Sequence, residues 1–469
     1  MFKSKTVTPP ADSLDIVILA AGKGTRMRSA LPKVLHRLAG LPLLEHVIRT
    51  ALTLKPRAVH VVYGHGGESV PETLTALPVS WVKQEPQLGT GHAVQQALPA
   101  VQSGNVLILY GDVPLTRTAT LEPLVESARR GALGLLTAEL ADPSGYGRIV
   151  RGAAGQVARI VEHKDATEAE RAIREINTGI VAAPAGRLQK WLAALRNHNV
   201  QGEYYLTDII GMAASEGLRI ETGRPQFEWE ILGVNSKAQL AELERIHQRN
   251  QAQALMELGL TLLDPARFDL RGTLRIGQDV VIDVNVVIEG DVVLGDRVRI
   301  GPNNVLRRCR IGADTIVHPN CVIEDAEIDV DCRIGPFARI RPETHIAGRA
   351  HIGNFVEIKK STIGVGSKVN HLTYVGDSTV GRDVNIGAGT ITANYDGANK
   401  HPTRIEDNAS IGSNCVLVAP VTIGAGATIG AGSVISKDAP AGELTVARAK
   451  AVTISGWKRP QKKPKSGGK

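Results

Sequence analysis

The feature that most constrains the fold is a six-residue aliphatic repeat in the C-terminal part of the chain. The repeated positions carry Ile, Leu or Val, and Gly often follows them, as in Ile276-Gly277 and Ile423-Gly424. With one-residue slips, the repeat runs through Ile276, Ile282, Ile288, Leu294, Ile300, Leu306, Ile311, Val317, Ile323, Ile328, Ile334, Ile340, Ile346, Ile352, Ile358, Ile363, Val369, Val375, Val380, Ile386, Ile405, Ile411, Leu417, Ile423, Ile429 and Ile435. This period fits neither an α-helix nor a plain strand, and is typical of a parallel β-helix in which three hexads form one triangular coil. At about 4.8 Å per coil, roughly nine coils would stack to about 40 Å.

One long interruption breaks this repeat between Ile391 and Ile405. The intervening stretch, TANYDGANKHPTR, is polar and rich in turn formers. Ordering such a loop costs conformational entropy, so loops ejected from a solenoid are disproportionately functional. The period leaves the hand of the coil open, although parallel crossovers are normally right-handed.

The N-terminal half has a different pattern, in which short β-rich runs alternate with helical stretches. Apolar runs predict strands at 16–19, 58–63, 105–110 and 132–140, and a helix at 43–52. Apolar strands separated by helices are typical of an α/β domain around a mainly parallel, Rossmann-like sheet. Aliphatic residues at helical spacing over 236–258 predict one long amphipathic helix that connects the two halves.

We therefore predict a chain of five segments. They are a disordered extension at 1–13, an α/β domain at 14–237, a helical linker at 238–258, a hexapeptide β-helix domain at 259–457 and a basic disordered tail at 458–469.

The basic charge of the chain is concentrated at its C-terminal end. The formal net charge is +8, and the six Lys and Arg residues of 458–469, with no acid among them, leave about +2 elsewhere. A short Pro/Lys/Gly tail is typical of a solvated end, and no basic stripe interleaved with aromatics indicates nucleic-acid binding. The four Cys residues have no CxxC or Cys/His metal spacing, and we expect free buried thiols. The absence of a signal-like or membrane-spanning run predicts a cytoplasmic protein with no membrane span.

A Gly-rich loop follows the first predicted strand. The run Ala20-Ala21-Gly22-Lys23-Gly24-Thr25-Arg26-Met27 matches neither the Walker A motif nor GxGxxG. Its small residues allow the backbone to approach a phosphate closely, and Arg26 and Lys33 supply the cations that a triphosphate needs. We interpret this loop as a phosphate site.

A second glycine loop and a carboxylate lie near the ends of later strands. The loop is Gln87-Leu88-Gly89-Thr90-Gly91-His92, and Asp112 follows the strand predicted at 105–110. Open α/β sheets bind ligands at that edge, and Mg²⁺ takes one or two protein oxygens together with phosphate and water. Asp112 and Asn235 suit that role. The alternative is that Asp112 merely caps a helix.

His371 lies two residues after the inward position Val369, so we expect its side chain at a corner or on the outer surface of the coil. Four other polar residues on nearby coils are also out of the inward phase: Arg341, Lys359, Tyr374 and Asn385. An imidazole among cations is suited to deprotonating an amine that arrives on an anionic sugar phosphate. A lone surface His, however, usually has no function.

Several motifs in a fixed order resemble the sugar-1-phosphate nucleotidyltransferases. They are LAAGKGTRMRSALPKVLH, QLGTGHA, YGDVPL, GYGRIV, EHKDA, INTGI, QGEYYLTD and GVN. The later motifs RPETH, NFVEIKK, HLTYVGD, NIGAGTITANYDGANK and GSNC resemble the acetyltransferase half of one bifunctional family. Over residues 14–457 the chain is similar to N-acetylglucosamine-1-phosphate uridylyltransferase/glucosamine-1-phosphate acetyltransferase.

This resemblance implies a left-handed parallel β-helix and two reactions. Acetyl-CoA would acetylate glucosamine-1-phosphate, and Mg²⁺-dependent uridylyl transfer from UTP would then give UDP-N-acetylglucosamine, a precursor of cell-envelope polysaccharide. The resemblance also implies a homotrimer with an acetyl site shared between neighbouring prisms. The alternative is a monofunctional sugar-1-phosphate nucleotidyltransferase whose β-helix is an oligomerisation or regulatory scaffold.

The resemblance also implies the site residues. UTP or the UDP-sugar would contact Leu19, Ala20, Ala21, Gly22, Lys33, Gln84, Gly89, Thr90, Tyr110, Gly111, Asp112, Gly147, Glu162, Asn177 and Asn235, with Mg²⁺ on Asp112 and Asn235 and the triphosphate held by Arg26 and Lys33. Glucosamine-1-phosphate would contact Arg341, Lys359, Tyr374 and Asn385, and acetyl-CoA would contact Ala388, Asn394, Tyr395, Ser413, Ala431 and Arg448. His371 would accept the proton, oriented by Glu357. One departure from the family pattern is the bulky run Phe227-Glu228-Trp229-Glu230 before GVN, which puts in doubt the wall of the sugar pocket near Asn235.

Overall fold

The computed structural model describes residues 12–462, which divide into two compact units between Gln251 and Ala252. Residues 1–11 of the predicted extension and 463–469 of the predicted tail lie outside the described part. Helix α8 (Lys237–Glu257) contains the boundary, and it matches the helix predicted over 236–258. The two units are described separately below.

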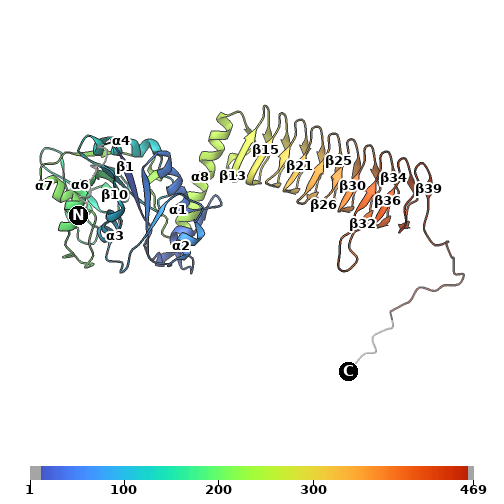
Figure 1. The fold of residues 1–469 in the computed structure, drawn as a ribbon, viewed down its shortest axis with the longest axis horizontal. Helices are drawn as coiled ribbons and strands as arrows, with labels where there is room; N and C mark the ends of the chain where they lie inside the picture. The colour runs from blue at the N-terminus through green and yellow to red at the C-terminus, as the bar shows by residue number, and fades with distance from the viewer. Residues whose placement is uncertain (1–11, 463–469) are drawn as a thin grey trace, which may run out of the picture. The chain divides into compact units, whose positions relative to one another are not determined.

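The N-terminal unit is built on a nine-stranded sheet (Figure 1). Its main path, in spatial order, is β11 (Ile220–Gly223), β7 (Leu133–Glu139), β10 (Glu175–Pro184), β6 (Asn105–Tyr110), β1 (Leu14–Leu19), β4 (Ala58–Tyr63) and β5 (Ser80–Lys83), with β8 (Arg148–Arg151) and β9 (Val157–Val161) as an added hairpin. β6, β1, β4 and β5 are parallel, and so are β11 and β7. β10 runs antiparallel to both β6 and β7. The predicted mainly parallel sheet is therefore confirmed, with one antiparallel strand inserted in it.

Helices cover both faces of this sheet. They are α1 (Leu43–Thr53), α2 (Ser69–Thr73), α3 (Thr90–Ala97), α4 (Thr118–Arg129), α5 (Glu168–Arg171), α6 (Ala185–Ala194) and α7 (Asp208–Ser215), and a small hairpin joins β2 (Arg37–Leu38) and β3 (Leu41–Pro42). Alternate residues of β1 enter different cores: Ile16 and Ile18 pack with α1 and α4, whereas Val17 packs with α3 and α6. Apolar side chains on both faces are the pattern expected of a buried strand.

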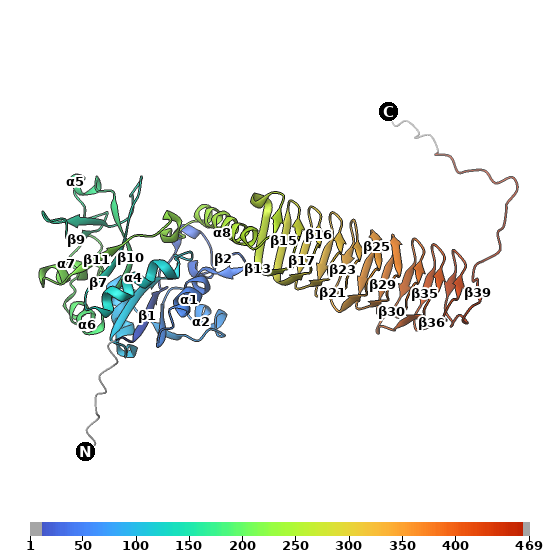
Figure 2. The same cartoon turned by 90° about the horizontal axis from the view of Figure 1, so that it is seen from above.

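The C-terminal unit is a parallel β-helix whose coils lie one beside the next along its axis (Figures 1 and 2). One face comprises β12 (Thr261–Leu262), β14 (Val281–Ile282), β16 (Arg299–Ile300), β19 (Ile316–Val317), β22 (Arg333–Ile334), β25 (His351–Asn354), β28 (Lys368–His371), β31 (Asn385–Ile386), β34 (Ser410–Ile411), β37 (Thr428–Ile429) and β39 (Leu444–Thr445). The remaining strands form one continuous sheet that wraps round the other faces: β13 (Phe268–Ile276), β15 (Val286–Leu294), β17 (Val305–Arg307), β18 (Arg310–Ile311), β20 (Val322–Glu324), β21 (Ala326–Ile328), β23 (Arg339–Ile340), β24 (Thr344–Ile346), β26 (Glu357–Lys359), β27 (Thr362–Ile363), β29 (Tyr374–Gly376), β30 (Ser378–Val380), β32 (Ile391–Ala393), β33 (Thr403–Ile405), β35 (Val416–Val418), β36 (Val421–Ile423) and β38 (Val434–Ile435).

The core of the β-helix consists of the predicted inward aliphatic residues. Every one of them from Ile282 to Ile435 is buried, and only Ile276, at the first coil, is partly covered. Burial of one such side chain stabilises a fold by roughly 1.5–3 kcal/mol, so the repeat itself supplies the driving force for the coil. The polar stretch after Ile391 leaves the coil as a loop before β33, as the interruption of the repeat predicts.

The corners of the coil require a left-handed backbone at regular intervals. Positive φ recurs at Asn303, Asp314 and Asn320, residue types that tolerate this conformation. The one-residue slips of the repeat coincide with further corners of this kind, such as Arg308 and Asp325, where φ is 45°. The slips are therefore corners shortened by one residue.

Two histidines meet where α8 packs on the N-terminal unit. His46 of α1 and His247 of α8 are in edge-to-face contact, with ring centroids 5.4 Å apart. Burial is the main cause that lowers the pKa of both rings, and it lowers the pKa of His247 to about 4. The nearest charged groups are Glu45, Arg49 and Glu244. The packed state therefore favours neutral rings.

This pair predicts acid lability in the N-terminal unit. Because the folded pKa of His247 lies below the unfolded value of 6.5, its contribution to the free energy of unfolding is complete above pH 6.5 and is lost as the pH falls towards 4. The loss for this ring is on the order of 3 kcal/mol. Urea unfolding of the wild type and of His247→Phe, followed by tryptophan fluorescence between pH 7 and 4.5, should show a smaller decline in the variant. Equal declines would contradict this assignment.

Candidate functional site

A cavity of about 460 Å³ opens in the N-terminal unit, where β1, β5 and β6 end. Ten of the predicted nucleotide residues line it: Leu19, Ala20, Ala21, Gly22, Lys33, Gln84, Gly89, Thr90, Tyr110 and Asp112. Lys23, Val34, Gln87, Ala93 and Glu203 also line it, although the sequence did not single them out as site residues. The predicted residues Arg26, Gly111, Gly147, Glu162, Asn177 and Asn235 lie outside this lining.

Parallel pairing brings the walls of the cavity together. Leu19 of β1 pairs with Tyr110 of β6, and the Gly111 amide donates to the Leu19 carbonyl at 2.9 Å. The Gly-rich loop and the Asp112 segment therefore leave the sheet side by side. Gly89 has a φ of 110°, and a Cβ on it would lie 2.7 Å from the Tyr204 carbonyl oxygen, so this close approach requires glycine.

Lys33 connects the two residues predicted to bind metal. Its Nζ lies 2.5 Å from Asp112 Oδ2 and 3.1 Å from Asn235 Oδ1. The Val234 amide donates to the Asp112 carbonyl at 2.9 Å, which holds the Asn235 segment against Asp112. Two hard oxygens thus converge on one cationic group, which is a donor set that fits Mg²⁺. The guanidinium of Arg26 is exposed and has no hydrogen bond or ion pair within residues 12–462.

Three further residues predicted to bind UTP or the UDP-sugar, Gly147, Glu162 and Asn177, form a second polar group. Glu162 Oε1 accepts a hydrogen bond from Thr207 Oγ1 at 2.9 Å, and burial raises the pKa of this carboxyl. The backbone N–H of Asn177 donates to the Gly147 carbonyl at 2.8 Å. A Cβ on Gly147 would lie 3.5 Å from Glu162 Oε2. Gly147, Glu162 and Asn177 are therefore neighbours. Nearby, burial and the negative charge of Glu162 raise the pKa of Tyr110.

His371 lies on the outside of the β-helix. Its side chain is exposed, whereas Val369, two residues earlier, is fully buried. Parallel pairing of β25 with β28 places Asn354 beside His371, and His371 Nδ1 lies 2.6 Å from Asn354 Oδ1. An oxygen at this distance requires a proton on Nδ1, which leaves Nε2 as the basic nitrogen.

Cations converge on the neighbouring face. The amino groups of Lys359 and Lys400 lie together, and this contact lowers the pKa of Lys400. Positive charge on Arg341 lowers the same pKa further, so the three cations share one region. Asp377 Oδ2 lies 3.5 Å from the Lys359 ammonium and also accepts from Asn394 Nδ2. Such a cluster of positive charge is suited to a phosphate group.

Glu357 forms no hydrogen bond or ion pair with His371 in the structure. Its Oε1 instead accepts from Arg341 Nη1 at 2.8 Å, so the prediction that Glu357 orients the imidazole is replaced by the Asn354 contact. Tyr374 pairs with Glu357 across β26 and β29, and its hydroxyl lies 3.5 Å from Asn394 Nδ2. Asn385 is exposed on β31.

Three of the residues predicted to bind acetyl-CoA, Ala388, Ser413 and Ala431, follow one corner of successive coils. The Asn414 amide donates to the Ala388 carbonyl at 2.7 Å, and the Gly432 amide donates to the Ser413 carbonyl at 2.8 Å. Arg448 Nη1 donates to the Ala431 carbonyl at 2.9 Å. Ala388, Ser413 and Ala431 thus form a file of small side chains. Tyr395, in the ejected loop, is exposed, and its hydroxyl donates to the Gly397 carbonyl at 2.6 Å.

Comparison with known proteins agrees with this division of the chain. The MobA-like NTP transferase domain family matches residues 16–257, and the bacterial transferase hexapeptide (six repeats) family matches 274–308 and 402–437. Over 455 residues the chain is 60% identical to the bifunctional protein GlmU of Ralstonia pickettii (strain 12J), covering 97% of this chain and 100% of the relative. It is 58% identical over 454 residues to that of Nitrosospira multiformis (strain ATCC 25196 / NCIMB 11849 / C 71), covering 96% and 99% respectively.

The chain belongs to the bifunctional GlmU family. This membership confirms the prediction of a two-domain uridylyltransferase and acetyltransferase. Within residues 12–462, no helix is both long and apolar enough to cross a membrane. The same residues contain no group of three or more His, Cys, Asp or Glu side chains that could hold a metal ion.

The sequence missed Asn354 and Lys400 as site residues. Asn354 precedes His371 by 17 residues, which is one coil, so the repeat period was the signal that could have identified it. Lys400 is the one Lys or Arg in the run between Ala393 and Thr403, and the positive charge of that loop was the signal.

The bulky residues Phe227 and Trp229 before the GVN motif pack on each other and on neighbouring side chains. The two rings stack on each other with centroids 5.3 Å apart, and Arg117 lies 5.8 Å from the centre of the Phe227 ring. Trp229 packs against the cluster that contains Met27 and Leu38. Neither ring lines the 460 Å³ cavity.

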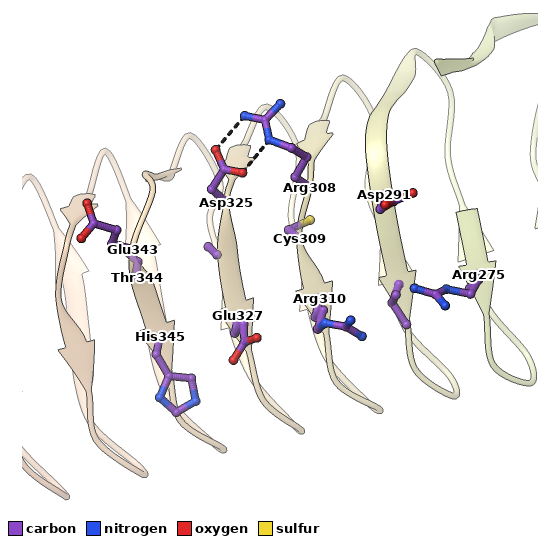
Figure 3. Close-up of a pocket in the computed structure, with 12 residues that line it drawn as sticks. Arg275, Asp291, Arg308, Cys309, Arg310, Asp325, Glu327, Glu343, Thr344 and His345 are labelled. Carbon is purple, nitrogen blue, oxygen red and sulfur yellow. Dashed lines mark hydrogen bonds and ion pairs between the residues drawn. The ribbon is translucent and has the colours of Figure 1, made fainter. Parts of the chain in front are cut away.

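A second hollow, of about 560 Å³, lies on the β-helix and contains none of the predicted site residues (Figure 3). Arg275, Arg308 and Arg310 line it together with acids that include Asp325 and Glu327. Arg308 forms two hydrogen bonds of 2.6 Å with Asp325, drawn as dashed lines in Figure 3. The acidic and basic side chains that line this hollow largely compensate one another in charge. Its volume alone therefore identifies no ligand.

Proposed function

We propose that this chain acetylates glucosamine-1-phosphate on its β-helix and joins the product to UTP in its α/β unit, releasing pyrophosphate and UDP-N-acetylglucosamine. The observation that carries the proposal is that each unit contains its own set of convergent polar groups. We further propose that the reactions occur in the cytoplasm and supply precursors of cell-envelope polysaccharide.

For uridylyl transfer, the nucleotide would occupy the cavity at the end of β1. A phosphate oxygen of N-acetylglucosamine-1-phosphate attacks the α-phosphorus of UTP in line, and the bond to pyrophosphate breaks. Lys33, at the cavity wall, and Arg26, nearby in the Gly-rich loop, offset negative charge on the triphosphate. Asp112 and Asn235 would hold Mg²⁺, which when bound would neutralise further phosphate charge. Gly147, Glu162 and Asn177 would contact the sugar.

For acetyl transfer, His371 would act as the general base. The amine of glucosamine-1-phosphate attacks the thioester carbonyl of acetyl-CoA, His371 Nε2 takes the amine proton, and the CoA thiolate leaves. Asn354 keeps the proton on Nδ1 so that Nε2 can accept. Arg341, Lys359, Tyr374 and Asn385 would bind the sugar phosphate, with Lys400 as a further cation. Ala388, Asn394, Tyr395, Ser413, Ala431 and Arg448 would bind acetyl-CoA.

We propose that the chain assembles as a homotrimer through the β-helix corner that contains His371. Three large apolar residues are exposed there on successive coils: Phe337, Phe355 and Leu372. All three have positive φ, between 51° and 55°, a conformation that is unfavourable for bulky residues, and the two Phe rings stack with centroids 5.1 Å apart. Contact with another copy would cover this apolar surface.

The trimer proposal predicts that one substitution reduces assembly and acetyl transfer but leaves pyrophosphate release intact. Phe355→Lys should give a monomer by light scattering, because a charge would lie in the covered surface. Acetyl transfer should fall at least tenfold if a neighbouring prism completes that site, while pyrophosphate release from UTP should change less than twofold. A trimeric Phe355→Lys, or a wild type that is monomeric, would refute the proposal. Val330→Lys, at another exposed position on the β-helix, is the matched control.

Asn354 and Glu357 are predicted to affect different kinetic constants of acetyl transfer. Asn354→Ala frees the imidazole, so kcat should fall by roughly 10–100-fold with KM for glucosamine-1-phosphate nearly unchanged. Glu357→Gln loosens Arg341, so its main effect should be a higher KM. An Asn354→Ala enzyme with wild-type kcat would show that the Nδ1 contact has no role.

The two active sites should be separable by single substitutions. In the presence of glucosamine-1-phosphate, acetyl-CoA, UTP and Mg²⁺, free thiol reports acetyl transfer and pyrophosphate reports uridylyl transfer. His371→Ala should abolish thiol release and spare pyrophosphate release from added N-acetylglucosamine-1-phosphate, and Asp112→Ala should do the reverse. If each folded variant loses both outputs, the two-site proposal is wrong. If the wild type releases pyrophosphate but no thiol, the β-helix is a scaffold.

A further inference from the structure

Glu230 is a buried carboxyl group that the proposed reactions do not use. It lies in the short 3-10 helix η4 (Glu228–Ile231), a few residues before Asn235, and its side chain is fully buried. Within residues 12–462 it pairs with no Lys, Arg or His side chain, and it does not line the 460 Å³ cavity. Burial of a carboxyl group without a cationic partner is costly, so the hydrogen bonds of this group must offset that cost.

Both carboxylate oxygens and the backbone carbonyl of Glu230 accept hydrogen bonds. Thr120 Oγ1 donates to Oε2 at 2.5 Å, and the backbone N–H of Phe227 donates to Oε1 at 3.1 Å. Thr116 Oγ1 donates to the Glu230 carbonyl at 2.8 Å. Thr120 lies in the first turn of α4, where the positive end of the helix dipole also favours a carboxylate. Two of the three donors therefore come from the segment that follows Asp112.

These hydrogen bonds join the two segments that supply the predicted metal ligands. One segment begins with Asp112 and continues into α4, and the other comprises η4 and ends with Asn235. Beside the ligands themselves, the backbone N–H of Val234 donates to the Asp112 carbonyl at 2.9 Å. The contacts of Glu230 are a second connection between the same two segments.

Apolar packing also holds the η4 segment in place. Ile231, next to Glu230, is buried in the core that contains residues of α1 and α4, and Val234 is fully buried. Such apolar contacts are non-directional, so they keep the segment attached without fixing the direction of its polar groups. Hydrogen bonds supply that direction. Loss of the Glu230 carboxylate should therefore leave the segment attached but let the separation of the two predicted ligands vary.

We propose that Glu230 is a positioning residue that fixes the separation of Asp112 and Asn235 and thereby sets the affinity of the site for a divalent cation. Glu230 itself does not contact the cation, because both of its carboxylate oxygens bind protein donors outside the cavity lining. Mg²⁺ demands near-octahedral geometry with oxygens at about 2.0–2.1 Å, so a small change in their separation weakens binding. This inference rests on the proposed function, which places Mg²⁺ on Asp112 and Asn235.

The first measurement is cation binding without turnover. Full-length protein saturated with UDP-N-acetylglucosamine is titrated with Mn²⁺, and the relaxation rate of water protons reports the bound ion. In Glu230→Ala the Kd for Mn²⁺ should rise roughly tenfold, as is typical when a group that orients a metal ligand is lost. The Kd for UDP-N-acetylglucosamine without a cation should change less than about twofold, because the cavity lining is intact.

Glu230→Gln is the conservative variant. Its Oε1 can still accept from the backbone N–H of Phe227, and its Nε2 can donate to Thr120 Oγ1, because a hydroxyl group both donates and accepts. The Kd of this variant for Mn²⁺ should therefore stay within about twofold of the wild-type value.

The second measurement is pyrophosphate release from UTP and N-acetylglucosamine-1-phosphate over a series of Mg²⁺ concentrations. Glu230→Ala should need roughly tenfold more Mg²⁺ for half of the maximal rate, while kcat at saturating Mg²⁺ stays within about threefold. Thiol release from acetyl-CoA should not change, because the residues proposed for that reaction lie in the other unit.

Glu221→Ala is the matched control. Glu221 lies on β11, and its Oε2 accepts from Ser127 Oγ at 2.5 Å near the other end of α4. This change should lower the melting temperature without changing the Kd for Mn²⁺. Thr120→Val removes only the hydroxyl group that binds Glu230, and it should raise the Kd for Mn²⁺ even if Glu230→Ala does not fold.

Three results would overturn the inference. They are an unchanged Kd for Mn²⁺ in a folded Glu230→Ala or Thr120→Val protein, an equal rise in Glu221→Ala, and an equal rise in Glu230→Gln. Failure of the proposed function would look different, because the wild type itself would then bind no Mn²⁺ in this complex and release no pyrophosphate from UTP.

Discussion

Parallel pairing of neighbouring strands is the constraint on which both candidate sites depend. In the N-terminal unit, Leu19 of β1 pairs with Val62 on one side and Tyr110 on the other, so the loops that follow three strands leave the sheet at one edge. In the β-helix, the same kind of pairing places His371 beside Asn354 of the preceding coil. Backbone hydrogen bonds fix these neighbours, so side chains that are remote in sequence meet with little freedom left to lose.

The buried aliphatic side chains of the β-helix could be predicted because their positions depend on local periodicity. Ile340 and Ile358, for example, occupy positions of the six-residue repeat and are fully buried. No long-range information is needed to assign them. The Gly-rich loop and Asp112 were equally accessible, because both follow apolar runs that had to be strands. β10 shows the limit of this reasoning. Its antiparallel direction depends on where the chain re-enters the sheet, which no local pattern encodes.

The outward contacts were harder to predict, because they depend on the number of residues in each coil. His371 stands 17 residues after its neighbour Asn354, whereas Arg333 pairs with His351 at a separation of 18. A corner shortened by one residue accounts for the difference, and it changes which polar side chains become partners. Glu357, which the family resemblance assigned to His371, instead accepts a hydrogen bond from Arg341. Side-chain partners of this kind follow from pairing and not from residue type.

The distribution of charge indicates what each site lacks in the protein alone. In the N-terminal unit, Lys33 already pairs with the Asp112 carboxylate and donates to the Asn235 amide oxygen, so an incoming triphosphate would compete with these contacts. On the β-helix the positive charge is less fully paired, because Arg341, Lys359 and Lys400 lie close together with fewer acids around them. Like charges this close oppose folding, and an anion between them would relieve that repulsion. A ligand at the first site therefore replaces existing partners of Lys33, whereas an anion at the second site adds a partner for the three cations.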